Sequence, residues 1–280
     1  MKTFKNNLIL LIILLFGYTS CVKKELEADN ELESSLDVFL ASAISNDMVN
    51  IADEAARTFS IGSFKTNAQS GLLANCATLT FDTLIASNVD TITVDFGSSN
   101  CMGNDGRNRR GKIQILFSGN YRDSLNKITV TPINYFVNDN GVSGVKTITN
   151  LGHNFTKHLI YEIKDNLTIV RADGKGNITH FAIRNREWYN GENTLTWDDD
   201  VYLISGNANG VSSTGREYRS NITKLLTRNM APGCRKYFTV GEIGLTPLGK
   251  ATRTINFGNG LCDNVAIVSV NGKEYEITLP

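Results

Sequence analysis

Residues 167–191, LTIVRADGKGNITHFAIRNREWYNG, carry the pattern that decides the fold of this chain. In Leu167–Ala172, apolar and polar residues alternate, which is typical of a strand with one buried and one solvated face. Ile178–Arg186 is expected to form the next strand. Asp173-Gly174 and Asn190-Gly191 are hairpin signals, because both central residues of a type I′ turn need a positive φ. Connections this short join antiparallel neighbours, since parallel strands need a longer crossover.

The same signals continue on both sides of this segment, from Cys76 to the end of the chain. Further turn signals are Asp105-Gly106, Asn140-Gly141, Asn209-Gly210 and Asn271-Gly272. Near the C-terminus, Tyr275, Ile277 and Leu279 alternate with polar residues, as in a half-buried strand. The sequence thus predicts a mainly β protein of the α+β class. Residues 63–280 are expected to form an antiparallel β meander, arranged as a sandwich or a half-barrel.

One amphipathic helix is predicted before the strands, over residues 34–62. Ser34–Asp37 has the pattern of an N-cap followed by an acid, and Gly62 is the expected stop. Apolar residues follow at the spacing of one helical face: Leu36, Phe39, Leu40, Ala43, Ile44, Met48, Ile51, Ala52, Ala55 and Phe59. The residues expected on the solvated side are Asp37, Ser42, Asn46, Asn50, Asp53 and Arg57. We expect the apolar stripe to pack on the sheet. The alternative is a helix lying on a membrane, but the polar side carries more acid than base.

Two stretches of the chain repeat one pattern at matched spacings. In the first, TVDFG (93–97) precedes Cys101 and Gly111-Lys112, and in the second, TINFG (254–258) precedes Cys262 and Gly272-Lys273. Each copy also has an upstream cysteine, Cys76 or Cys234. We interpret residues 76–115 and 234–277 as a duplicated hairpin. This equivalence favours the disulfides Cys76–Cys101 and Cys234–Cys262 among the three connectivities that four cysteines allow.

The first 21 residues have the organisation of an export signal. Lys2 and Lys5 precede an apolar run, Leu8–Phe16, which is too short to be a comfortable permanent membrane span. We expect residues 1–20 to be a signal peptide. Small residues directly before Cys21 resemble the lipobox of bacterial lipoproteins, which implies that Cys21 carries the lipid. A secreted protein with an incidental cysteine is the alternative, and residues 21–33 are expected to be a solvated tether.

A wider resemblance is carried by the repeat and by the end of the chain. Residues 254–264, which end in C-D-N, and residues 270–279, which contain N-G-K, resemble the C-terminus of a group of Bacteroidota cell-envelope lipoproteins. The stretch 96–112 is similar to the middle of those proteins. The resemblance implies a place in the bacterial envelope and brings no information on activity. We expect the chain to be lipid-anchored at the outer membrane, on its periplasmic face or at the cell surface.

No catalytic, cofactor or metal motif is recognised in this sequence. The three histidines, His153, His158 and His180, do not have the spacing of a common metal site. Asp198-Asp199-Asp200 is a weak calcium candidate, and a solvated strand edge is the favoured interpretation. Arg107, Arg109, Arg110 and Lys112 are expected to form a solvated basic patch. The chain has 28 basic and 28 acidic residues, a balance that does not favour nucleic acid as a partner. We therefore expect no cofactor, no bound metal and no enzyme activity.

Both tryptophans fall within ten residues of each other. Trp188, Tyr189 and Trp197 would gather near one hairpin if Asn190-Gly191 forms its turn. Sugar rings stack on aromatic platforms of this kind, so these three residues are the predicted ligand contact. The alternative is ordinary cross-strand aromatic packing.

The resulting hypothesis is a membrane-anchored, non-catalytic envelope lipoprotein that acts as a binding or structural module. Its expected partners are the membrane, through the lipid, and a glycan or an envelope protein. One alternative is a carrier that holds an apolar ligand in a half-barrel cavity with the helix as a plug. A second alternative is an enzyme that uses the dispersed carboxylates Asp198, Asp199 and Glu187.

Overall fold

One helix and one sheet of fourteen strands make up the described part of the chain, residues 29, 31–59, 73, 76–84, 89–120, 122–194 and 196–279 of a computed structural model. The paired strands are antiparallel and follow chain order across the sheet, except that β3 pairs only with β4. The predicted antiparallel β meander with one helix is therefore confirmed, in the form of a single open sheet.

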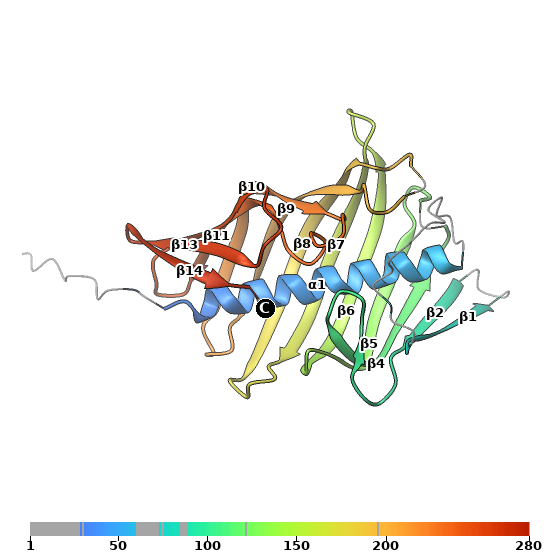
Figure 1. The fold of residues 1–280 in the computed structure, drawn as a ribbon, viewed down its shortest axis with the longest axis horizontal. Helices are drawn as coiled ribbons and strands as arrows, with labels where there is room; N and C mark the ends of the chain where they lie inside the picture. The colour runs from blue at the N-terminus through green and yellow to red at the C-terminus, as the bar shows by residue number, and fades with distance from the viewer. Residues whose placement is uncertain are drawn as a thin grey trace, which may run out of the picture.

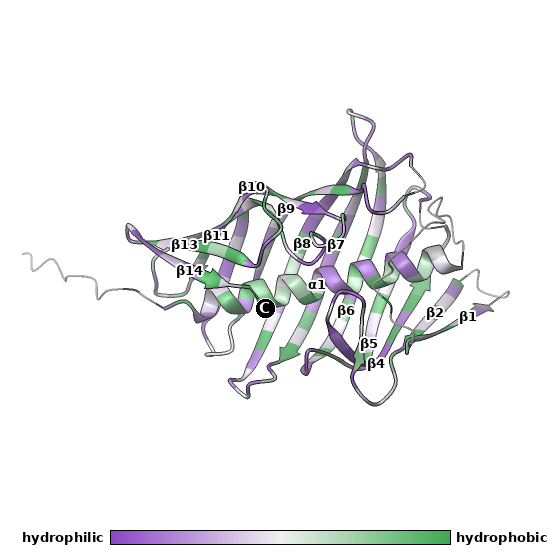
Figure 2. Cartoon of the chain, viewed as in Figure 1, coloured by the Kyte–Doolittle hydropathy of each residue, from purple (hydrophilic) through white to green (hydrophobic). Residues whose placement is uncertain are grey.

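The strand bounds follow the alternation of buried and exposed residues. The strands are β1 (Thr78–Leu84), β2 (Val89–Asp95), β3 (Cys101–Met102), β4 (Asn108–Phe117), β5 (Lys127–Val137), β6 (Asn140–His153), β7 (Leu159–Val170), β8 (Asn177–Asn190), β9 (Val201–Val211), β10 (Glu217–Asn229), β11 (Val240–Pro247), β12 (Arg253–Asn259), β13 (Val265–Val270) and β14 (Lys273–Thr278). Hydrophobic and hydrophilic bands alternate along them in Figure 2. Each central strand therefore has one face toward the core and one toward solvent.

The turn signals are correct in some places and displaced in others. Asn271-Gly272 joins β13 to β14 with φ values of 51° and 74°, as a type I′ turn requires. Between β5 and β6 the turn residues are instead Asn138 and Asp139, at φ 46° and 62°, and Asn140-Gly141 begins β6. Asn209-Gly210 lies inside β9 and not in a turn, because Tyr218 of β10 pairs with Gly210. Asparagine and aspartate can adopt positive φ without a glycine, so the dipeptide alone does not fix the turn.

Helix α1 (Glu33–Thr58) runs across the strands on one side of the curved sheet (Figure 1). It starts one residue before the predicted position and ends before Gly62, which lies outside the described residues. The prediction of a solvated polar side is wrong for Asp37, Ser42, Asn50 and Asp53, which are all buried. For Asp37 the burial has a physical cause: the guanidinium of Arg171 lies opposite its carboxylate, as described below.

Two clusters of apolar side chains pack along α1. In the larger cluster Met48 and Ile51 pack with strand residues such as Ile115. In the smaller one Phe39 lies 5.9 Å from Phe257 between ring centroids, beside residues of β10–β14. The concave side of the sheet is therefore filled by the helix. Each fully buried side chain of this size contributes about 1.5–3 kcal/mol relative to exposure.

Both predicted disulfides are present. Cys76–Cys101 and Cys234–Cys262 join residues 25 and 28 apart in the sequence. They close the hairpins β1–β2 and β11–β12, so the cysteine part of the repeat has a structural basis. The Gly-Lys part of the repeat is not structurally equivalent in the two copies. Lys112 of β4 pairs directly with Asp95 of β2, whereas Lys273 belongs to β14, which does not pair with β12.

The predictions for the N-terminal segment lie outside the described residues. These are the signal peptide 1–20, the lipid site Cys21 and most of the tether 21–33. Where the tether is described, the prediction of a solvated segment is wrong, because Asp29 is buried against Arg253 and Glu33 begins α1. Among the helical residues that are described, no helix combines the length and apolarity needed to cross a membrane.

Candidate functional site

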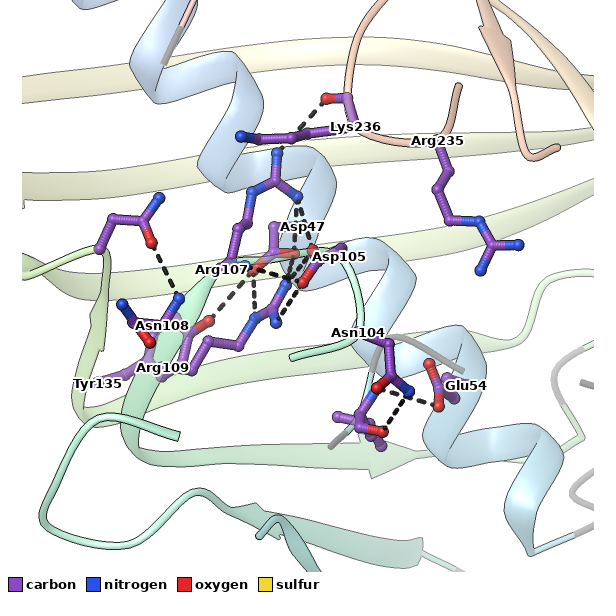
Figure 3. Close-up of polar contacts among 12 residues, drawn as sticks. Asp47, Glu54, Asn104, Asp105, Arg107, Asn108, Arg109, Tyr135, Arg235 and Lys236 are labelled. Carbon is purple, nitrogen blue, oxygen red and sulfur yellow. Dashed lines mark hydrogen bonds and ion pairs between the residues drawn. The ribbon is translucent and has the colours of Figure 1, made fainter. Parts of the chain in front are cut away.

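A buried carboxylate of α1 holds two arginines of the sheet (Figure 3). Asp47 accepts hydrogen bonds from Arg109 Nε and Nη2 at 3.1 and 2.6 Å, and from Arg107 Nη1 at 3.1 Å. The Tyr135 hydroxyl donates to Asp47 at 3.2 Å, and Asp105 accepts from both arginines. Burial would raise the pKa of Asp47, but the charges of Arg109 and Arg107 and the hydrogen bonds from Arg109 and Tyr135 lower it to about 2. The carboxylate therefore stays ionised and ties the helix to β4 and β5.

This geometry corrects the predicted solvated basic patch. Arg107 and Arg109 are 4 % and 0 % exposed, because alternation along the chain turns them toward α1. Arg110 and Lys112 do reach the solvated side, where they pair with Asp139 and Asp95. The patch is thus divided between the core and the surface.

A second link joins the helix to β6 and β7 through three buried polar side chains. Ser45 Oγ donates to Asp165 Oδ2 at 2.7 Å, and Lys146 Nζ lies 2.7 Å from Ser45 Oγ and ion-pairs with Asp165. Burial lowers the pKa of Lys146 although Asp165 opposes that change. A serine beside a lysine can act as a nucleophile in hydrolases. Here the lysine is ion-paired and the adjoining cavity measures only about 20 Å³, so it cannot admit an acyl substrate.

Two more links hold the beginning of α1. Asp37 accepts hydrogen bonds from Arg171 Nη1 at 2.6 Å and from the Ser213 backbone at 2.7 Å. Before the helix, Asp29 accepts one from Arg253 Nη2 at 2.8 Å. Acidic side chains near a helix N-terminus also complement its dipole. The buried polar contacts therefore fix the position of α1 on the sheet.

Each of the carboxylates considered for catalysis has a partner of its own in the structure. Asp198 pairs with Arg235 at 2.7 Å, and Asp199 accepts from the Thr194 hydroxyl at 2.9 Å. Glu187 lies on β8, 2.5 Å from His158 Nδ1. Within the described residues, no group of three or more His, Cys, Asp or Glu side chains is placed to hold a metal ion.

The predicted aromatic platform is not exposed. Trp188 is 4 % and Trp197 1 % exposed, and only Tyr189, at 53 %, faces solvent. Trp188 Nε1 donates to Asp200 at 3.0 Å, and the Trp188 ring lies 5.6 Å from that of Tyr202. The prediction of a ligand contact by both tryptophans is therefore wrong, because β8 turns Trp188 inward and the following loop packs Trp197 into the core.

A groove of about 560 Å³ lies instead on the sheet face that points away from α1. We call it the outer groove. It is lined by Thr179, Phe181, Asn209, Gly210, Val211, Glu217, Tyr218, Arg219, Thr246, Pro247, Leu248, Gly249 and Lys250. Most of these residues belong to β8–β11, and the last three form the turn between β11 and β12.

Strand register places the outer groove's side chains in a row. Phe181 pairs with Asn209, Asn209 with Arg219, and Arg219 with Thr246. Opposite residues of antiparallel strands have Cβ atoms about 5 Å apart, so the four side chains are immediate neighbours. The turn is held in place because the Leu248 amide donates to the Glu217 carbonyl at 2.8 Å.

The chain matches no known family model, no curated protein and no solved structure. The interpretation of the outer groove therefore depends on its own chemistry.

The outer groove combines exposed apolar groups with free polar groups. Phe181 is 44 % and Leu248 65 % exposed. In the part of the chain that the structure describes, the side chains of Asn209, Glu217 and Arg219 make no hydrogen bond or ion pair. They offer an amide, a carboxylate and a guanidinium on one surface, which can donate and accept hydrogen bonds together. A volume of 300–1,000 Å³ is typical of sites for small ligands.

Sequence reasoning missed this site because its residues come from four strands. Their proximity depends on the register between strands, which short sequence patterns do not specify. The available signal was weak: Thr179 and Phe181, and Glu217 and Arg219, are each two residues apart and so share a face.

Proposed function

We propose that the protein is a non-catalytic binding module, held at the cell envelope by a lipid on Cys21, whose outer groove binds a glycan. The observation that carries the proposal is the row Phe181–Asn209–Arg219–Thr246 in the outer groove. It presents an exposed ring beside the side chains of Asn209 and Arg219, which have no partner among the described residues. The lipid anchor rests on the sequence pattern that ends at Cys21.

A glycan fits this chemistry better than other ligand classes. Sugar hydroxyls both donate and accept, so they match a surface with an amide, a guanidinium and a carboxylate. The apolar face of a sugar ring can pack on the exposed Phe181 ring. An extended peptide would need an open strand edge for main-chain pairing, but β9 and β10 are paired on both sides.

The carrier alternative receives no support from the interior. The residues of α1 fill the concave side, and the hollow between α1 and β7–β10 measures only about 20 Å³. An apolar ligand needs a cavity at least ten times larger, about 300 Å³.

The test is a binding screen with paired variants. A panel of neutral and acidic oligosaccharides is immobilised and probed with the wild-type protein, with Asn209→Ala and with Asn207→Ala. Asn207 lies two residues away on the same face of β9, is exposed and does not line the outer groove. We expect binding that Asn209→Ala weakens about tenfold and Asn207→Ala leaves unchanged. Equal effects of the two variants, or no binding to any glycan, would refute the proposal.

A further inference from the structure

A small polar cavity lies between α1 and the sheet, apart from the outer groove. Its polar lining comes from Ser42, Ser45 and Asn46 of α1 and from Asp165, His180 and Arg184 of the sheet. Its volume is about 20 Å³, enough for one monatomic ion or one water molecule.

Two buried hydrogen-bond donors that line this cavity have no partner among the described residues. Arg184 is 8 % exposed and Ser42 7 %, yet neither Arg184 Nη1 nor Ser42 Oγ makes a hydrogen bond. Such groups cost free energy unless something accepts from them, and a buried charged donor costs most.

The charges around the cavity favour a negative occupant. Asp165 is the one carboxylate in its lining, and it is already held by Lys146 and Ser45. Among the described residues Arg184 has no ion-pair partner, and Asp165 attracts it only from a longer distance.

The remaining titratable group is neutral. His180 Nδ1 forms a hydrogen bond of 2.8 Å with the Tyr218 hydroxyl. Burial lowers the pKa of His180 to about 4. It therefore neither cancels the positive charge nor adds to it near neutral pH.

We propose that this cavity is a binding site for a monatomic halide anion, which accepts hydrogen bonds from Arg184 Nη1 and Ser42 Oγ. Chloride supplies the missing negative charge, has no protons of its own that need acceptors, and is small enough for the space. A water molecule would satisfy the donors but would leave the buried charge uncompensated. The anion joins α1 to β8 only in the folded protein, so it stabilises the fold increasingly as its free concentration rises above the Kd.

The test measures thermal unfolding in sodium gluconate with increasing sodium bromide at constant ionic strength. Gluconate is too large for the cavity, so only the halide can bind there. We expect the melting temperature to rise with the logarithm of the bromide concentration above the Kd, by about 5–10 °C when bromide exceeds its Kd a hundredfold. Ser42→Ala should reduce the shift. Ser35→Ala should keep it, because Ser35 is a buried serine of the same helix that does not line the cavity.

Arg184→Met gives a result that simple destabilisation would not give. It removes an uncompensated buried cation, so its melting temperature in gluconate should equal or exceed that of the wild type, with no response to bromide. In crystals grown with bromide, an anomalous peak between Ser42 and Arg184 is expected. A wild type without halide response, a response kept by Arg184→Met, or a water without anomalous signal would each overturn the proposal.

Discussion

Replacing Asp47 by asparagine tests how α1 is held in the sheet. The substitution keeps the shape of the side chain but removes a charge that is 1 % exposed and contacts two arginines that are at most 5 % exposed. Arg107 and Arg109 would then share only Asp105. Removing one partner from a buried ion pair costs about 3–5 kcal/mol, because the other charge stays buried. For a chain of this length, that corresponds to a fall of about 10 °C in Tm.

Glu162→Gln is the matched control for this substitution. Glu162 pairs with Lys164 at 2.6 Å, but the lysine is 52 % exposed, so the loss should stay within about 1 kcal/mol. Chemical denaturation of both variants measures the difference directly. If Asp47→Asn costs no more than Glu162→Gln, the ion pairs do not hold the helix.

The same carboxylate predicts a dependence on pH. The pKa of Asp47 is about 2 in the folded protein and lies near 3.8 in the unfolded chain. Its contribution of about 2.5 kcal/mol is therefore complete above pH 3.8 and is lost as the pH falls toward 2. The gap in unfolding free energy between wild type and Asp47→Asn should narrow over that range. A gap that is constant from pH 6 to pH 2 would contradict the assignment.

Three other predictions concern the anchor, a disulfide and the core. Cys21→Ala should move the protein from the membrane fraction to the soluble fraction, and a variant that still sediments with membranes would contradict the lipid anchor. Replacing Cys76 and Cys101 together by alanine should lower the free energy of unfolding by about 3.5 kcal/mol in the chain-entropy model, measured by urea denaturation; an unchanged midpoint would contradict it. Trp197→Ala should cost about 3–5 kcal/mol of stability, and a variant that melts like the wild type would show that the ring is not core.

The fold could be predicted where a local pattern determines the structure. Asn271-Gly272 occupies its turn because both residues can take positive φ, and the cysteine spacing gave the correct disulfides. The solvated side of the helix could not be predicted in the same way. Asp37 and Asp47 are buried only because Arg171 and Arg109 reach them from strands far away in the sequence.

The candidate site could not be predicted, because it depends on contacts between residues that are distant in the sequence. Trp188 and Trp197 are close in sequence, but both are buried, and Trp188 is held there by its contacts with Asp200 and Tyr202. The outer groove needs the register of β8–β11, so Phe181 and Arg219 show no relation in the sequence. The outer groove is formed by the pairing of residues on different strands, which the periodicity within a single strand does not predict.

The binding role is tested most directly by a second matched pair on β8. Phe181 and Ile183 are 44 % and 49 % exposed on the same face, but only Phe181 lines the outer groove. With an oligosaccharide selected by the panel, titration calorimetry should give a Kd that Phe181→Ala raises about 5- to 30-fold, for a loss of 1–2 kcal/mol. Ile183→Ala should leave the Kd unchanged. Equal Kd values for the two variants would contradict glycan binding in the outer groove.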